Sequence, residues 1–309
     1  MDNNFTHISV LLKEAVDALD IKPNGIYVDG TAGGGGHSYE IAKRLSGGRL
    51  ISIDRDPDAI KAATKRLAEF DCCTIVNARF SQISQILDEQ GVDQIDGFLL
   101  DLGVSSHQLD TGERGFSYHM EAPLDMRMGS STTSAADLVN TLSDKELSDI
   151  FYKYADERFA NRIAQKIVEQ RSVAPIETTT QLADLISACY PNKFKRDGHP
   201  ARKVFQALRI AVNDEFGEEE KALADGFERL KPGGRFSVIT FHSAEDRLVK
   251  QAFAGFAQGC TCPPEFPVCV CGAKPRGKLV FRKPQTASAE ELNLNPRARS
   301  AKLRAIEKL

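Results

Sequence analysis

The sequence predicts an α/β fold in which a mostly parallel, doubly wound sheet is interrupted by an all-helical insertion. Strand-like and helix-like segments alternate up to Asp101, and repeated β-α units give parallel sheets. No buried strand is expected between 111 and 214, where helix signals follow one another. Strand character returns at Arg235–Phe241. These three observations together indicate one α/β domain split by a helical one.

The first part of the sheet is expected from four apolar segments. They are Gly25–Asp29, Arg49–Asp54, Cys73–Ala78 and Ile95–Asp101. The last is apolar enough to be buried on both faces, as strands of parallel sheets are. The helices between them are Ser38–Leu45, Pro57–Phe70, which has proline near its start, and Ile83–Gln90.

The insertion opens with two capping boxes, Ser134-x-x-Asp137 and Ser143-x-x-Glu146. Its further helices are Glu157–Arg171, Thr180–Tyr190 and Ala201–Asp214. A helix over Glu218–Leu230, a turn at Lys231–Gly234 and strands at Arg235–Phe241 and Lys278–Arg282 complete the core. The expected boundaries are 1–109 and 215–283 for the core, 110–214 for the helical substrate domain and 284–309 for a basic, weakly ordered or helical tail.

The composition predicts a globular cytoplasmic protein with no membrane partner. Hydrophobic residues make up 41% of the 309 residues and charged residues 27%. No run approaches the ~18 apolar residues of a membrane helix, and the first residues do not resemble a signal peptide. Seven cysteines, an odd count without export signals, favour a reducing compartment.

The net charge of -3 hides an uneven distribution. Residues 260–309 carry ten Lys/Arg and four Asp/Glu, a net of +6, whereas the other 259 residues carry 30 and 39, a net of -9. A basic end on an acidic body is compatible with a surface that contacts phosphates, or with a merely solubilising tail.

A glycine-rich turn joins the first strand to the first helix and contains Gly33, Gly34, Gly35 and Gly36. The dinucleotide pattern G-x-G-x-x-G starting at Gly33 needs glycine at 38, where Ser38 stands, and this disfavours nicotinamide. An acid before the glycines suits the zwitterionic end of S-adenosylmethionine better. Asp54 ends the second strand, where a carboxylate accepts ribose hydroxyls.

Ligands bind outside the carboxyl ends of the strands in open α/β sheets, and several polar or aromatic residues follow predicted strands. They are Gly33, Asp54, Phe80, Asp101 and His242. Phe80 either flanks an adenine or packs in the core. Burying Asp101 unpaired would be costly, which favours a functional role. Ser243 and Asp246 are expected to form a capping box, which leaves His242 to face the cleft or to be a buried structural histidine.

Eight segments carry a closer resemblance. They are VDGTAGGGGHS (28–38), IDRDPDAI (53–60), DLGVSSHQLD (101–110), RGFSY with PLDMRM (114–128), ERFANRIA (157–164), FQALRIAVNDE (205–215), FHSAEDR (241–247) and NPRARSAKLR (295–304). Over nearly the whole chain they closely resemble the ribosomal small-subunit methyltransferase H family, the bacterial 16S rRNA (cytosine-N4)-methyltransferases.

The resemblance implies a class I, Rossmann-like, S-adenosylmethionine-dependent fold with an inserted helical substrate domain. It implies methylation of N4 of a decoding-centre (P-site) cytidine in 16S rRNA of the small ribosomal subunit, with no DNA partner. Carried over residue by residue, Gly35, Gly36 and His37 match the loop at the methionine side of the cofactor, and Asp54 matches the ribose-binding acid. The remaining matched cofactor contacts are Phe80, Asp101 and Gln108.

An acceptor for an N4 hydrogen would favour attack by this weakly nucleophilic amine. Asp101 is the first candidate for this catalytic role, followed by Ser105, Ser106 and His242; the two serines and Gln108 could instead bind the base or satisfy a turn. Phe116 or Tyr118 could stack on the unstacked base, or pack between core and insertion. Candidate phosphate contacts are Arg202, Lys203, Arg209, Arg297, Arg299, Lys302 and Arg304.

The cysteine motif and two other functions remain open. Cys260, Cys262, Cys269 and Cys271 could hold zinc, but C-x-C is tighter than the usual C-x2-C, so no metal is expected. The alternative from another class is a non-catalytic ribosome-assembly factor that binds S-adenosylmethionine as a structural ligand. The third is the nicotinamide oxidoreductase.

Overall fold

The computed structural model describes residues 9–103, 114–128, 132–191, 199–260, 262, 266 and 271–309. The chain divides into two compact units. The larger consists of Met1–Gly103 and Gly217–Leu309, and the smaller of Val104–Phe216. Among the described residues, no helix is both long enough and apolar enough to span a bilayer.

The larger unit is built on a seven-stranded sheet with the order β3-β2-β1-β4-β5-β7-β6. The strands are β1 Ile26–Asp29, β2 Arg49–Asp54, β3 Cys73–Asn77, β4 Ile95–Asp101, β5 Leu230–Thr240, β6 Gly277–Leu279 and β7 Lys302–Lys308. Neighbours from β3 to β5 pair in parallel, and β7 runs antiparallel to both β5 and β6. The predicted α/β class with a mostly parallel sheet is therefore confirmed.

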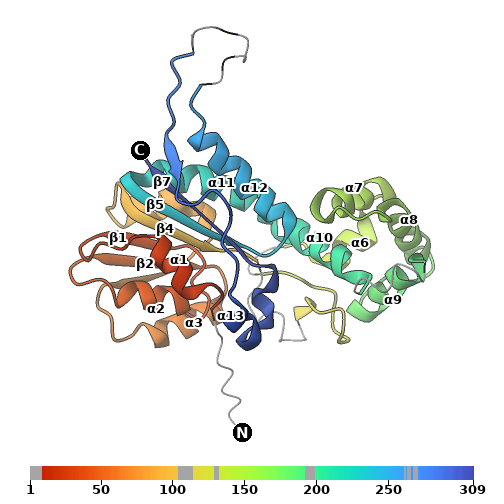
Figure 1. Cartoon of the computed structure of the whole chain (residues 1–309). Coiled ribbons are helices and arrows are strands. Elements are labelled where there is room, and N and C mark those ends of the chain that lie inside the picture. Colours follow the sequence, from red (N-terminus) through yellow and green to blue (C-terminus); the bar gives the residue numbers. More distant parts are fainter. Residues whose placement is uncertain are drawn as a thin grey trace. The chain divides into compact units, whose positions relative to one another are not determined.

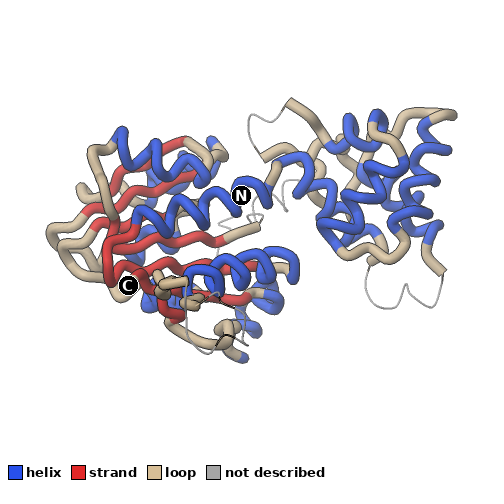
Figure 2. Tube along the Cα trace, turned by 90° about the horizontal axis from the view of Figure 1, so that it is seen from above, coloured by secondary structure: helices blue, strands red, loops and turns tan. Residues whose placement is uncertain are grey.

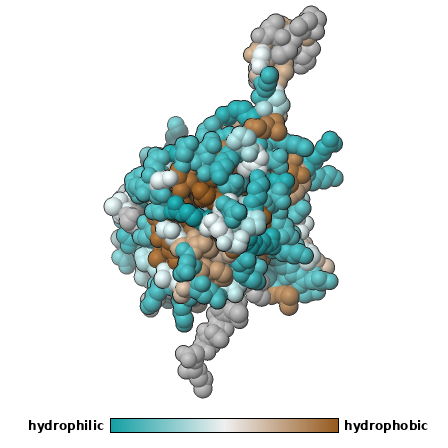
Figure 3. Space-filling view, turned by 90° about the vertical axis from the view of Figure 1, so that its left-hand side faces the viewer, coloured by the Kyte–Doolittle hydropathy of each residue, from teal (hydrophilic) through white to brown (hydrophobic). Residues whose placement is uncertain are grey.

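Helices cover both faces of this sheet, as Figures 1 and 2 show. The helices are α1 Leu12–Ala18, α2 Gly36–Ala42, α3 Pro57–Arg66, α4 Ile83–Glu89, α11 Glu215–Arg229, α12 Ser243–Ala257 and α13 Ala289–Leu294, with the 3-10 helices η1 Phe80–Gln82 and η4 Pro296–Ser300. In Figure 1, α1, α2 and α3 lie below the sheet, and α11 and α12 lie above it. The side of this unit seen in Figure 3 is mainly hydrophilic, with scattered hydrophobic patches.

Strand β4 is the centre of the core because its side chains alternate between the two helical layers. Phe98 and Leu100 belong to the cluster with α4, α11 and α12, and Leu99 belongs to the cluster with α1 and α2. All three are fully buried, and the ring of Phe98 stacks on that of Phe236 with centroids 4.6 Å apart. Burial on both faces fixes the position of the carboxyl end of β4.

The prediction of a weakly ordered or helical tail over 284–309 is wrong for its final residues. They form β7, which lies between β5 and β6, with Leu303, Ala305 and Ile306 buried. Lys302 and Arg304 pair with Asp246 at 2.9 and 2.7 Å, so both charges stabilise the core unit. Charged and apolar residues alternate here, which is the pattern of a half-buried strand.

The turn predicted at Lys231–Gly234 lies inside β5 instead. Its extra residues are accommodated by a shift in register, in which Ile95 pairs with Leu230 but Gly97 pairs with Arg235. Gly233 has φ +77°, a conformation that favours glycine. The glycines therefore make a bulge in a strand that continues past them.

The smaller unit is helical in its described part. Its helices are α6 Ala135–Thr141, α7 Asp144–Ala155, α8 Ala160–Arg171, α9 Thr179–Cys189 and α10 Ala201–Asn213. The capping boxes predicted at Ser134 and Ser143 are confirmed, and Thr178 begins a third. Apolar side chains from all five helices form one core of their own.

Candidate active site

Three acidic residues end neighbouring strands of the larger unit. Asp29 ends β1, Asp54 ends β2 and Asp101 ends β4, and these strands pair in parallel. Parallel strands present their carboxyl ends at a single edge, so the three carboxylates gather there. This edge was predicted to hold the site.

Asp29 ties helix α2, which follows the glycine turn, to the sheet. Its carboxylate is fully buried and accepts hydrogen bonds from Ser38 Oγ at 2.6 Å and from the Thr31 amide at 3.2 Å. Burial raises its pKa to about 6. The sequence showed this acid before the glycines, but we did not predict it as a site residue; its role is to fasten the start of α2.

The glycine turn is held by backbone hydrogen bonds to two strands. The amide of Gly30 donates to the Leu99 carbonyl and that of Ala32 to the Ile53 carbonyl, both at 2.9 Å. The amide of Gly33 donates to Asp54 Oδ2 at 2.8 Å. The turn is therefore fixed to β4 and β2 before any ligand binds.

Each glycine in the turn meets a different local demand. Gly33 and Gly35 have φ +51° and +77°, in the left-handed region. A Cβ on Gly35 would lie 3.3 Å from the Cα of Ala63, and one on Gly36 would lie 1.9 Å from Ser9 Oγ. A Cβ on Gly34 would meet nothing within 4 Å. Space beside Gly34 and close packing at Gly35 and Gly36 suit a backbone that cradles a ligand.

Asp54, the predicted ribose-binding acid, also organises the turn. Its Oδ2 accepts from the Gly33 amide, and its Oδ1 accepts from the Asp56 amide at 2.8 Å. Burial raises its pKa, against the effect of these two hydrogen bonds. Each carboxylate oxygen has two lone pairs, so acceptor capacity for ribose hydroxyls is left.

The environment of the Asp101 carboxylate differs from that of Asp29 and Asp54. Its amide donates to Thr31 Oγ1 at 2.6 Å, which locks the end of β4 to the glycine turn. Among the described residues, its buried Oδ1 has no hydrogen-bond partner. Burial first, and then the charges of Asp29 and Glu245, raise the pKa of this carboxyl well above its ordinary value.

His37, predicted from the resemblance as a cofactor-loop residue, faces Asp101. It is 4% exposed, and its Nδ1 lies 3.8 Å from Asp101 Oδ2. Its Nε2 lies 3.2 Å from the Val10 carbonyl, which can only accept, so Nε2 carries the proton. In the neutral ring, Nδ1 is then an acceptor that faces Asp101.

The capping box predicted for Ser243 and Asp246 is wrong by one residue. His242 is the N-cap of α12: its Nδ1 accepts from the Glu245 amide, and Glu245 Oε2 accepts from the amides of Phe241 and His242. Asp246 pairs with β7 instead. Capping thus accounts for His242, the weakest of the predicted catalytic candidates.

Of the remaining predicted cofactor and catalytic residues, the structure describes only Phe80. Phe80 begins η1 after β3 and packs against the core cluster that contains Phe98; its Cβ would lie 3.2 Å from a Cβ on Gly30. Ser105, Ser106 and Gln108 lie outside the described residues.

The two predicted base-stacking residues differ in how far their rings are exposed. Phe116 is 7% exposed and lies in the core of the smaller unit, so packing excludes it as an open stacking surface. Tyr118 is half-buried, and its ring stacks on His199 with centroids 4.6 Å apart and planes 18° apart. His199 and His119, both exposed, are not among the residues predicted from the sequence.

The predicted phosphate contacts also differ in exposure and in their hydrogen-bond partners. Arg202 on α10 is exposed, and no ion pair of its side chain is found among the described residues. Lys203 Nζ donates to the Asp156 carbonyl at 3.0 Å. Arg209 is 12% exposed and makes two hydrogen bonds to Glu215, which disfavours it as a phosphate contact. In the larger unit, Arg297 and Arg299 are exposed on η4.

Comparison with known proteins finds close relatives along the whole chain. Residues 4–309 match the model of the MraW methylase family. Three relatives are each called ribosomal RNA small subunit methyltransferase H. The protein of Symbiobacterium thermophilum is 53% identical over 99% of this chain and 97% of its own length. The corresponding values are 54%, 99% and 100% for Paenibacillus sp. and 53%, 99% and 99% for Pelobacter propionicus.

The glycine turn gives a matched pair of variants. Gly35→Ala forces a Cβ into the left-handed region and against Ala63, which should lower the free energy of unfolding by about 1–2 kcal/mol. Gly34→Ala puts its Cβ into open space and should leave stability within about 0.5 kcal/mol of the wild type. Denaturant unfolding measures both. Equal effects would contradict the assigned backbone geometry.

Proposed function

The chain belongs to the MraW methylase family and is a methyltransferase, and from that premise we propose its substrate and mechanism. It transfers a methyl group from S-adenosylmethionine to N4 of a decoding-centre (P-site) cytidine of 16S rRNA in the small ribosomal subunit. The observation that carries the proposal is the buried Asp101 Oδ1, an acceptor without a partner among the described residues at the ligand-binding edge.

The glycine turn and the acids fit this cofactor. The amides of the turn are fixed, Gly34 borders open space, and Asp54 keeps acceptor capacity for a ribose. Phe80 supplies an apolar surface beside the turn. S-adenosylmethionine, when bound, supplies an electrophilic methyl group on a sulfonium.

Asp101 then activates and orients the base. The N4 lone pair of cytosine is delocalised into the ring, and a fixed acceptor for an N4 hydrogen favours the pyramidal nitrogen that attacks. A carboxylate whose pKa burial has raised is also a stronger base, and so accepts the proton that N4 loses after methylation. The buried ring of His37, which lies beside Asp101 Oδ2, limits the positions that this carboxylate can take. Most of the rate enhancement comes from holding the reactants in place.

The RNA is recognised on the smaller unit by stacking and by charge. Tyr118 and His199 form a stacked pair at the start of α10, and the Arg202 amide donates to the His199 carbonyl at 3.1 Å. The exposed ring of His199, stacked on the half-buried Tyr118, suits an unstacked base, and the exposed Arg202 three residues along the chain suits a phosphate. The aromatic grip comes from this pair, not from the buried Phe116.

The two alternatives have less support. A non-catalytic assembly factor has no need of a buried acceptor that costs free energy to leave unpaired. A nicotinamide oxidoreductase would need glycine at position 38, where Ser38 instead bonds to Asp29.

Transfer of labelled methyl groups tests the proposal directly. The full chain is incubated with methyl-labelled S-adenosylmethionine and small subunits from a strain that lacks the enzyme. We expect about one methyl group per subunit, recovered after digestion as N4-methylcytidine. Subunits from the unmodified strain, already methylated, are the control. Cofactor binding without transfer would support the assembly factor, and label on another atom would contradict the assigned N4.

Exchanging one cation tests the RNA surface. Arg202→Ala should weaken binding to the small subunit by roughly 10-fold, because one phosphate contact is lost. For the same reason, the slope of the logarithm of the binding constant against the logarithm of the salt concentration should become shallower by about one. Lys145→Ala, an exposed cation on α7 of the same unit, is the matched control and should leave both unchanged. Filter binding over a range of salt concentrations measures both variants. Indistinguishable losses would argue against a specific contact at Arg202.

A further inference from the structure

A group of cysteines in the larger unit has no part in the proposed reaction. Cys260, Cys262 and Cys271 lie in the connection between α12 and β6, whose described ends extend away from the sheet in Figure 1. None of the three forms a disulfide. Their presence was noted in the sequence, where the C-x-C spacing argued against a metal.

The base of this connection is anchored firmly to the core. The Arg276 amide donates to the Phe256 carbonyl at 2.9 Å, and the Leu309 amide donates to the Arg276 carbonyl at 2.9 Å. The Arg276 guanidinium lies over the rings of Phe227 and Phe256, 5.6 and 5.3 Å from their centroids. The two ends of the connection are thus held together, which brings Cys271 back beside Cys260.

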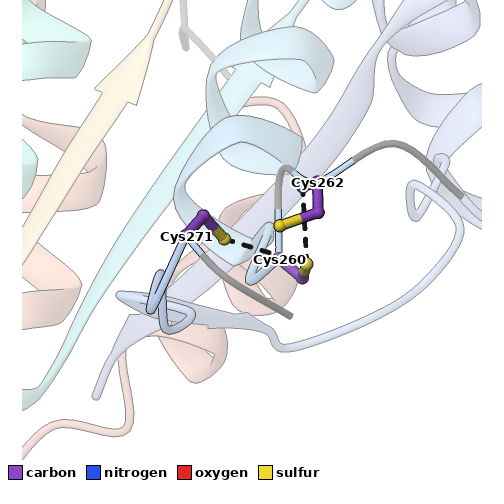
Figure 4. A group of neighbouring side chains, drawn as sticks. All are labelled: Cys260, Cys262 and Cys271. Atoms are coloured by element: carbon purple, nitrogen blue, oxygen red, sulfur yellow. Dashed lines mark hydrogen bonds between the residues drawn. The ribbon is translucent and has the colours of Figure 1, made fainter. Parts of the chain in front are cut away.

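The sulfur atoms converge as ligands of a single ion would. All three Sγ atoms lie within 4.8 Å of one another, and those of Cys260 and Cys271 are 3.8 Å apart (Figure 4). Two thiolates on a tetrahedral zinc at ~2.3 Å each are ~3.8 Å apart. A disulfide would need ~2.05 Å. The observed separation therefore matches shared coordination and not an S–S bond.

A backbone amide already stabilises one of these sulfurs. The Cys262 amide donates to Cys260 Sγ at 3.4 Å, and Figure 4 shows this contact together with that between Cys271 and Cys260. Donors to a ligand sulfur stabilise the thiolate and orient it, as outer-shell partners of metal sites do. The tight C-x-C spacing, which seemed unfavourable in the sequence, makes this contact possible.

The described residues of the connection supply little hydrophobic support of their own. Cys260 and Cys271 are exposed, Cys262 is half-buried, and the side chain of Phe266 is 51% exposed. The residues of the connection that the structure describes form no helix or strand, and a cross-link would hold them in a defined fold. A structural metal ion provides one, with binding free energy that becomes folding free energy.

We propose that Cys260, Cys262 and Cys271 bind one structural zinc ion as thiolates. Three soft sulfur ligands favour zinc over the hard cations Mg²⁺ and Ca²⁺. Cys269, the other cysteine of the motif, lies outside the described residues and is not part of the proposed site. The zinc stabilises this connection and takes no part in methyl transfer, so this proposal stands apart from the proposed function.

Metal content tests the site. The full chain is expressed and purified without chelators, any affinity tag is removed, and zinc is measured by plasma mass spectrometry. We expect about one zinc per chain, falling below about a tenth in the Cys260→Ser/Cys271→Ser variant. Cys72→Ser, a half-buried cysteine next to β3, is the matched control and should keep its zinc.

A spectroscopic measurement covers the case in which the double variant fails to fold. Cobalt(II) added to the chelator-stripped wild type should give thiolate-to-metal charge-transfer absorption, and zinc should displace it. Metal-free protein whose cysteines all react as free thiols, with no such absorption on adding cobalt, would overturn the proposal. Zinc retained by a folded double variant would overturn it as well.

Discussion

The site depends on gathering three largely desolvated carboxylates at the carboxyl edge of the parallel strands. Asp29, Asp54 and Asp101 end adjacent strands, and an unpaired buried charge is costly. Ser38 and Thr31 offset this cost at Asp29, and the amides of Gly33 and Asp56 do so at Asp54. The same donors fix the glycine turn. Of the three, only Asp101 keeps a buried oxygen that has no hydrogen-bond partner among the described residues, which is the observation behind its proposed role.

The surrounding elements keep this edge rigid. Strand β4 is buried on both faces, and the Asp101 amide is bonded to Thr31, so the carboxylate starts from a fixed backbone. On the far side of β5, Lys302 and Arg304 of β7 hold Asp246 in the first turn of α12. Part of the basic end of the chain therefore stabilises the core, and its +6 charge is not all available to phosphates.

Much of this was predictable from the sequence because its signals are local. The bounds of β2 and β4, the capping boxes at Ser134 and Ser143 and the family were all predicted correctly. The wrong predictions concern residues whose structure depends on tertiary contacts. A short charged-apolar alternation in β7 becomes a strand because β5 and β6 pair with it. The ion pair that disfavours Arg209 as a phosphate contact depends on Glu215, which lies against it in the fold. Likewise, no spacing rule brings Cys271 to Cys260.

The central claim is that Asp101 accepts the proton of N4, and the single-turnover rate of Asp101→Asn with saturating S-adenosylmethionine tests it most directly. Only ionised Asp101 can accept, and its pKa is raised, so the wild-type rate should rise with pH through that raised value. In Asp101→Asn, the single-turnover rate should fall by about 100-fold or more, and it should no longer depend on pH in this way. Asp54→Asn should instead raise the KM for the cofactor and keep the profile. Full turnover by Asp101→Asn, with the wild-type pH profile, would contradict the account.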